Sequence, residues 1–160
     1  MTTEKAGFGY QSDNDETLRT PDGGNSNLNF GLNPGCKITK FEFNPNGGQG
    51  GSKQDAIDLV VDVNGTEVNH RFFNITKVYV DGNLIADDGS DAFTEKFNAE
   101  MVQLKATLIH VVKATGVTEQ QLKATLSKGF NSFEDYAKVL TALMPKGFQN
   151  KEVDLFLEYQ

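Results

Sequence analysis

Residues 56–73 read AIDLVVDVNGTEVNHRFF, two alternating segments on either side of Asn64-Gly65. Apolar residues at every second position are typical of a strand with one buried face. Asn-Gly is the strongest two-residue hairpin signal, because both turn positions require a positive φ. Such a turn fixes the register. The predicted pairs are Val63–Thr66, Val61–Val68, Leu59–His70, Asp58–Arg71, Ile57–Phe72 and Ala56–Phe73.

Further strands are expected on both sides of this hairpin. In residues 36–43 the apolar side chains change from even to odd positions, which predicts a β-bulge near Thr39 and Lys40. Residues 78–80 predict a short strand, and strict alternation returns in residues 153–159. The sequence therefore predicts an antiparallel sheet in which the first strand is bent.

Residues 90–144 have helical periodicity instead. The first helix is predicted from apolar residues spaced by three and four, namely Phe93, Phe97, Met101, Leu104, Leu108 and Val111. Ser90 or Asp91 can cap its start. A second helix begins at Thr118 with a capping-box pattern, and a third begins at Ser132.

Helices enclosed between strands predict one α+β domain. A bent strand, a hairpin, a helix after the third strand and a return to β structure is the order of the OB-fold, a five-stranded, partly open antiparallel β-barrel that often binds oligonucleotides. We therefore expect an OB-like domain over residues 31–160, with a helical insertion of about three helices over 90–144. The strand count is one short, so either the early strands contribute an extra edge or the chain stops before a closing strand.

Residues 1–30 are rich in Gly, Asn and Asp and poor in apolar side chains. This composition is typical of a flexible N-terminal arm. We expect residues 1–29 to be dispensable for folding.

Composition limits the possible functions. The chain has 160 residues and a net charge of -7, which gives no general attraction to nucleic acid or to an anionic membrane. No apolar run reaches the roughly 20 residues of a membrane span. Cys36 is the single cysteine, and neither His70 nor His110 has a second metal ligand at a recognised spacing, so we expect no metal and no cofactor.

Signatures of catalysis are also missing. The glycine-rich loop at residues 47–52 lacks the lysine that would meet phosphates, and it is expected to connect two strands. Asp87, Asp88 and Asp91 precede the first helix, where negative charge favours the positive end of the helix dipole. The chain is not expected to be an enzyme.

The sheet region instead mixes lysines with aromatic side chains. Single-stranded nucleic acid is bound by a cationic groove together with aromatic faces on which bases stack. The candidate DNA-binding residues are Lys37, Lys40, Lys53, Arg71, Phe73, Lys77 and Tyr79. Two of them have a structural alternative, in which Arg71 pairs with Asp58 and Phe73 packs under the helices.

Several stretches resemble the single-stranded DNA-binding proteins of tailed bacteriophages, the crAss-like group and its relatives. The resemblance lies in residues 31–46, 55–66, 71–73, 143–148 and 151–160. It implies an OB-like fold that coats single strands during replication and recombination in the cytoplasm of the infected bacterial host. Replication proteins are a further candidate partner. Members of that family usually continue with more strand and often an acidic tail, whereas this chain ends at Gln160.

Two hypotheses follow from the sequence. The first is a sequence-tolerant single-stranded DNA-binding domain, favoured by the resemblance and by the interleaved aromatic residues. The second is a phage structural or protein-interaction domain with no nucleic-acid ligand, favoured by the acidic balance. Binding of a labelled oligo-dT at several salt concentrations separates them.

Overall fold

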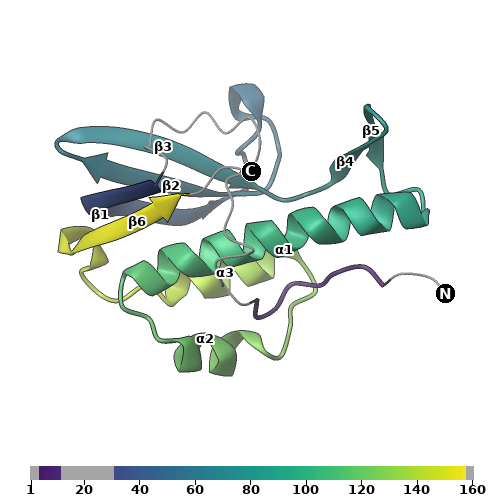
Figure 1. Cartoon of the computed structure of the whole chain (residues 1–160). Coiled ribbons are helices and arrows are strands. Elements are labelled where there is room, and N and C mark those ends of the chain that lie inside the picture. Colours follow the sequence, from purple (N-terminus) through teal and green to yellow (C-terminus); the bar gives the residue numbers. More distant parts are fainter. Residues whose placement is uncertain (1–3, 12–30, 158–160) are drawn as a thin grey trace.

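The computed structural model describes residues 4–11 and 31–157 (Figure 1). Strands precede and follow three consecutive helices, so the chain has the expected α+β fold. The elements in chain order are β1 (Gly31–Asn44), η1 (Gln49–Gly51), β2 (Ala56–Val63), β3 (Thr66–Phe73), β4 (Lys77–Val80), β5 (Asn83–Ala86), α1 (Asp91–Ala114), α2 (Glu119–Leu126), α3 (Phe133–Ala142), η2 (Phe148–Asn150) and β6 (Glu152–Leu157).

The main sheet is antiparallel, with the strand order β3-β2-β1-β6. The β2–β3 register agrees with the predicted one at every pair from Val63–Thr66 to Ala56–Phe73. Asn64 and Gly65 have φ values of 54° and 86°, as the turn requires. The hairpin is therefore confirmed.

The bulge in β1 is also confirmed. The register of β1 on β2 shifts between Ile38 and Lys40. The extra residue, Thr39, lets both Ile38 and Phe41 point into the core, where each is at most 2% exposed. Lys40 consequently lies on the opposite face of the sheet.

The predicted OB-like barrel is not confirmed. Strand β4 does not join the main sheet but pairs with β5 in a separate hairpin, and sequence reasoning missed β5. Asp81 and Gly82 form the turn between them, with φ values of 51° and 80°. Among residues 31–157 the strands form an open sheet and this hairpin, and no closed barrel is detected.

The three helices begin where the sequence predicts. The Ser90 hydroxyl accepts a hydrogen bond from the Phe93 backbone N–H (3.1 Å). Thr118 forms a capping box with Gln121, and the Ser132 hydroxyl caps α3. These contacts satisfy N–H groups that have no partner within the helix.

Helices α1 and α3 cover one face of the main sheet, while α2 lies farther from it (Figure 1). The core between the layers consists of apolar side chains from the inner face of the sheet and from the helices. Its largest fully buried members include Ile38, Ile57, Phe93, Met101 and Tyr136. None of the helices within the described part of the chain is long and apolar enough to cross a membrane.

Residues 4–11, which the sequence analysis included in the arm, pack against the helices. Phe8 lies between Phe133 and Tyr136, with ring centroids 5.9 and 5.7 Å away. The buried Lys105 Nζ donates a hydrogen bond to the Gly7 carbonyl (2.6 Å). These contacts count against the expectation that residues 1–29 are dispensable. The rest of the expected arm, residues 1–3 and 12–30, lies outside the described residues.

Candidate nucleic-acid interface

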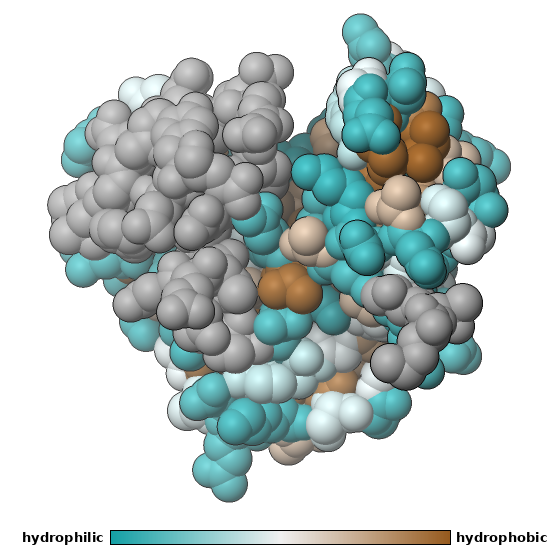
Figure 2. Space-filling view, turned by 45° about the vertical axis from the view of Figure 1, so that its right-hand side comes forward, coloured by the Kyte–Doolittle hydropathy of each residue, from teal (hydrophilic) through white to brown (hydrophobic). Residues whose placement is uncertain are grey.

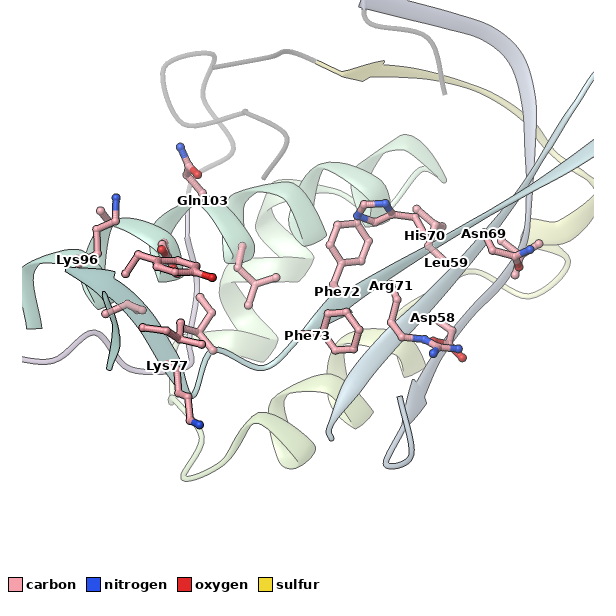
Figure 3. Close-up of a pocket in the computed structure, with 18 of the residues that line it drawn as sticks. Asp58, Leu59, Asn69, His70, Arg71, Phe72, Phe73, Lys77, Lys96 and Gln103 are labelled. Atoms are coloured by element: carbon pink, nitrogen blue, oxygen red, sulfur yellow. The ribbon is translucent and has the colours of Figure 1, made fainter. Parts of the chain in front are cut away.

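A groove of about 1150 Å³ lies between β3, the β4–β5 hairpin and the N-terminal half of α1 (Figure 3). Strand β3 is an edge of the main sheet in the part of the chain that the structure describes, and the groove contains side chains from both of its faces. Figure 2 shows the surface hollowed beside a lobe at the upper right on which hydrophobic atoms gather. The groove-lining residues from β3 are Asn69, His70, Arg71, Phe72 and Phe73.

Three large apolar side chains of this groove are exposed. Phe73 is 41% exposed, Tyr79 61% and Leu84 52%. Phe73 projects from the face of β3 opposite to the helices, whereas its neighbour Phe72 is only 4% exposed and points toward the core. The alternative in which Phe73 packs under the helices is therefore wrong.

Arg71 is held in place by the protein itself. Its Nε donates to Asp58 Oδ1 (2.6 Å) and its Nη1 donates to the Gly47 carbonyl (2.8 Å). Asp58 is 8% exposed and also accepts a hydrogen bond from Asn44 Nδ2 (2.9 Å). The predicted Asp58–Arg71 ion pair is thus present, and the guanidinium ties β3 to the glycine-rich loop.

The loop requires glycine where Arg71 reaches it. A Cβ at Gly47 would lie 2.6 Å from the Ala56 Cβ and 3.2 Å from the Arg71 Cδ. The loop is therefore packed against β2 and β3, as expected for a strand connector.

Five of the seven predicted DNA-binding residues line this one groove: Lys40, Arg71, Phe73, Lys77 and Tyr79. The other two do not. Lys37 lies on β1 opposite Asp62 and Glu152, and Lys53 lies in the loop before β2. The structure therefore places Lys37 and Lys53 outside the groove.

Sequence reasoning missed the contribution of α1. Lys96, Glu100 and Gln103 line the groove from this helix. Their spacing of four and three residues places them on one helical face, and this spacing is the signal that could have identified them. The sequence of the helix itself does not determine which strand this helical face contacts.

The groove has a positive balance within an acidic chain. Lys40, Arg71, Lys77 and Lys96 contribute four positive charges, and Asp58 and Glu100 two negative ones, which leaves +2 against -7 for the whole chain. Lys77 has no ion-pair partner among the described residues, in contrast to Arg71. Lys40 Nζ lies 3.9 Å from Glu42 Oε2 and 3.9 Å from Asp58 Oδ2. The positive charge that is free to meet a ligand therefore comes mainly from Lys77 and Lys96.

Two groove residues have shifted pKa values. Burial raises the pKa of the Glu100 carboxyl, and the neighbouring Lys96 ammonium partly opposes this rise. Burial also lowers the pKa of His70, whose ring lies 4.5 Å from that of Phe72. Both shifts favour the neutral form of the side chain.

Within residues 4–11 and 31–157, no group of three or more His, Cys, Asp or Glu side chains is arranged to hold a metal ion. Comparisons of the chain with protein-family models, with curated proteins and with solved structures found no match. The resemblance to phage single-stranded DNA-binding proteins therefore rests on the sequence patterns alone.

Proposed function

We propose that this protein binds single-stranded DNA, with little dependence on base sequence, in the groove between β3, the β4–β5 hairpin and α1. The observation that carries the proposal is the presence of two exposed aromatic side chains, Phe73 and Tyr79, in one groove with a positive balance. Each base stacked on an aromatic ring contributes roughly 1 to 3 kcal/mol, and any base can stack. The proposed role is binding without a catalytic step.

The size of the groove favours a chain-like ligand. Its volume of about 1150 Å³ exceeds the roughly 300 to 1000 Å³ of most small-molecule pockets. Bases in a duplex are stacked on one another, so their faces are not free to meet Phe73 and Tyr79. A single strand presents free base faces together with phosphates.

The phosphate contacts are assigned to Lys77 and Lys96, and to Lys40 when a phosphate displaces its long contacts of 3.9 Å to Glu42 and Asp58. Arg71 is already bonded to Asp58 and to the loop, so its role in the proposal is to shape the groove. Three neutralised phosphates give a salt slope of about -2, because each contributes about -0.7 on a single strand. This shallow slope fits an acidic protein that binds with moderate affinity.

The proposed setting, taken from the resemblance alone, is phage replication or recombination in the cytoplasm of the infected host, with replication proteins as candidate partners. Part of the proposal is that the bulged β1 and the β1–β2–β3 meander derive from an OB-like fold, a class that often binds oligonucleotides.

Fluorescence anisotropy of a labelled oligo-dT at increasing salt tests the proposal. Lys77→Ala should reduce the salt slope by about 0.7, while Lys53→Ala, the matched change outside the groove, should leave it unchanged. Absence of binding to any oligonucleotide at low salt would refute the proposal. It would leave the second hypothesis, a protein-interaction domain without a nucleic-acid ligand. This hypothesis is favoured by the edge of β3 that has no neighbouring strand among the described residues.

A further inference from the structure

One edge of β3 has no strand beside it within the described residues. In a two-residue hairpin, the pair next to the turn exchanges backbone hydrogen bonds, and here that pair is Val63 and Thr66. Along the two strands away from the turn, hydrogen-bonded pairs alternate with non-bonded pairs. The residues of β3 that direct their backbone N–H and C=O away from β2 are therefore Glu67, Asn69, Arg71 and Phe73.

This edge is well suited to pair with another strand. It contains eight residues, has no proline, and its register on β2 has no bulge. Proteins commonly protect such edges with a proline or a bulge, or by covering them. The groove opens beside the edge from Asn69 to Phe73, so this part of it is accessible.

We propose that a second copy of this chain pairs with this edge, β3 against β3 in antiparallel orientation, around a two-fold axis at Asn69. A two-fold contact brings the same surface of both copies together, so the edge must complement itself. With Asn69 at the axis, Glu67 lies opposite Arg71 of the partner subunit, and by symmetry the same ion pair forms twice. Opposite charges at directly facing positions stabilise a strand pair.

Other registers lack this complementarity. An axis at Arg71 would place two guanidinium groups face to face, and an axis at Glu67 two carboxylates. An axis at His70 would pair Arg71 with Asn69 of the partner subunit. An axis at Val68 would pair Glu67 with Asn69 of the partner subunit. Neither register forms an ion pair at these positions. Charge therefore selects the Asn69 register.

The backbone agrees with this selection. In the Asn69 register, Asn69 faces its symmetry copy and Glu67 faces Arg71 of the partner subunit. All of these residues direct their backbone N–H and C=O outward, so a regular antiparallel ladder forms. Arg71 uses Nε and Nη1 within its own chain, and its side chain is 42% exposed. Its other guanidinium nitrogen, Nη2, remains to bind Glu67 of the partner subunit.

Self-pairing would occupy the wall of the groove from Asn69 to Phe73. A second copy and single-stranded DNA would then compete for the same side of β3. This competition is expected only if the groove binds DNA, so it rests on the proposed function. The self-pairing itself does not, because it is measured on the protein without DNA.

Sedimentation equilibrium of the full chain over a range of concentrations tests the proposal. We expect a monomer–dimer equilibrium. Asn69→Pro removes one outward N–H from each copy, deleting two hydrogen bonds, and should weaken the dimer about 30-fold while leaving the hairpin intact. Asn69→Ala keeps the N–H and should dimerise like the wild type. A chain that is monomeric at every concentration, or an Asn69→Pro variant that dimerises normally, would overturn the proposal.

Charge variants provide a second test that does not depend on proline. Glu67→Lys should weaken the dimer about tenfold, because it replaces two attractive pairs with repulsive ones. Glu42→Lys, the same charge change on β1 away from the edge, should not. Equal effects of the two would contradict the Asn69 register. A chain that dimerises but binds no oligonucleotide at concentrations where it is monomeric would refute the proposed function alone, and a monomer that binds oligo-dT would refute self-pairing alone.

Discussion

Phe72 and Phe73 are adjacent on β3 but point to opposite faces, which makes them a matched pair for mutation. Phe73 is 41% exposed, so about three-fifths of the roughly 1.5 to 3 kcal/mol for burying a phenylalanine applies to it. Phe73→Ala should therefore lower the free energy of unfolding by about 1 to 2 kcal/mol. Phe72 is 4% exposed and packs in the core, so Phe72→Ala should cost about 3 to 5 kcal/mol.

For the affinity for oligo-dT we expect the opposite order, with a larger loss from Phe73→Ala than from Phe72→Ala. If a base stacks on Phe73, its replacement by Ala weakens binding of oligo-dT by roughly 1 to 3 kcal/mol, or about 5- to 150-fold. Urea unfolding followed by far-UV circular dichroism gives the stability, and anisotropy under conditions where each variant is folded gives the affinity. A folded Phe73→Ala protein with wild-type affinity would refute the stacking role, whatever its stability.

Three further predictions concern pH and the N-terminal segment. Burial lowers the pKa of His70 in the folded protein, so the unfolded chain binds a proton at His70 more readily than the folded one. The free energy of unfolding should therefore fall as the pH drops below about 6.5, and His70→Gln should reduce this fall in thermal melts. An equal fall in the wild type and the variant would contradict the prediction. Glu100→Gln should tighten oligo-dT binding at pH 7, because it removes a negative charge from the groove. This advantage should shrink at lower pH, where the raised pKa of Glu100 lets the wild type become neutral; an advantage that does not change with pH would argue against this titration. Phe8→Ala should lower the free energy of unfolding by about 2 kcal/mol in urea titrations, and an unchanged value would favour the expectation that residues 1–29 are dispensable for folding.

Local signals were sufficient where neighbouring residues determine the structure. Asn64-Gly65 fixed a turn of two residues, and with it every pair of the β2–β3 hairpin. The change of apolar phase in β1 located the bulge between Ile38 and Lys40. The hydroxyls of Ser90 and Ser132 located two helix starts, because they satisfy backbone N–H groups within the same turn.

Strand β5 was missed although a similar signal was present. Asp81-Gly82 forms a two-residue turn like that of Asn64-Gly65, but β5 has only four residues, most of them exposed, so no clear alternation marks it. The expected OB-like barrel is not confirmed, for a related reason. Closure depends on which strands meet across the fold, and neither periodicity nor turn chemistry encodes that contact.

The candidate site was predictable only in part. Alternation along β3 placed Arg71 and Phe73 on the outer face, and the structure agrees. Lys96 was missed because its place in the groove depends on how α1 packs against β4. Lys53 was included because it is close in sequence to the sheet, but the packed glycine-rich loop places it outside the groove.

The position of β6 beside β1 affects how the chain folds during synthesis. Lys37 and Glu152 face each other in the sheet, yet all three helices lie between them in the sequence. Contacts between distant residues form late, because the entropy of closing the loop is lost before they stabilise anything. Until residues 152–157 emerge from the ribosome, β1 lacks its β6 neighbour from Gly31 to Lys37, which makes it a second open edge among the described strands. A chain stalled before this point therefore has two open edges and a greater tendency to aggregate than the finished fold.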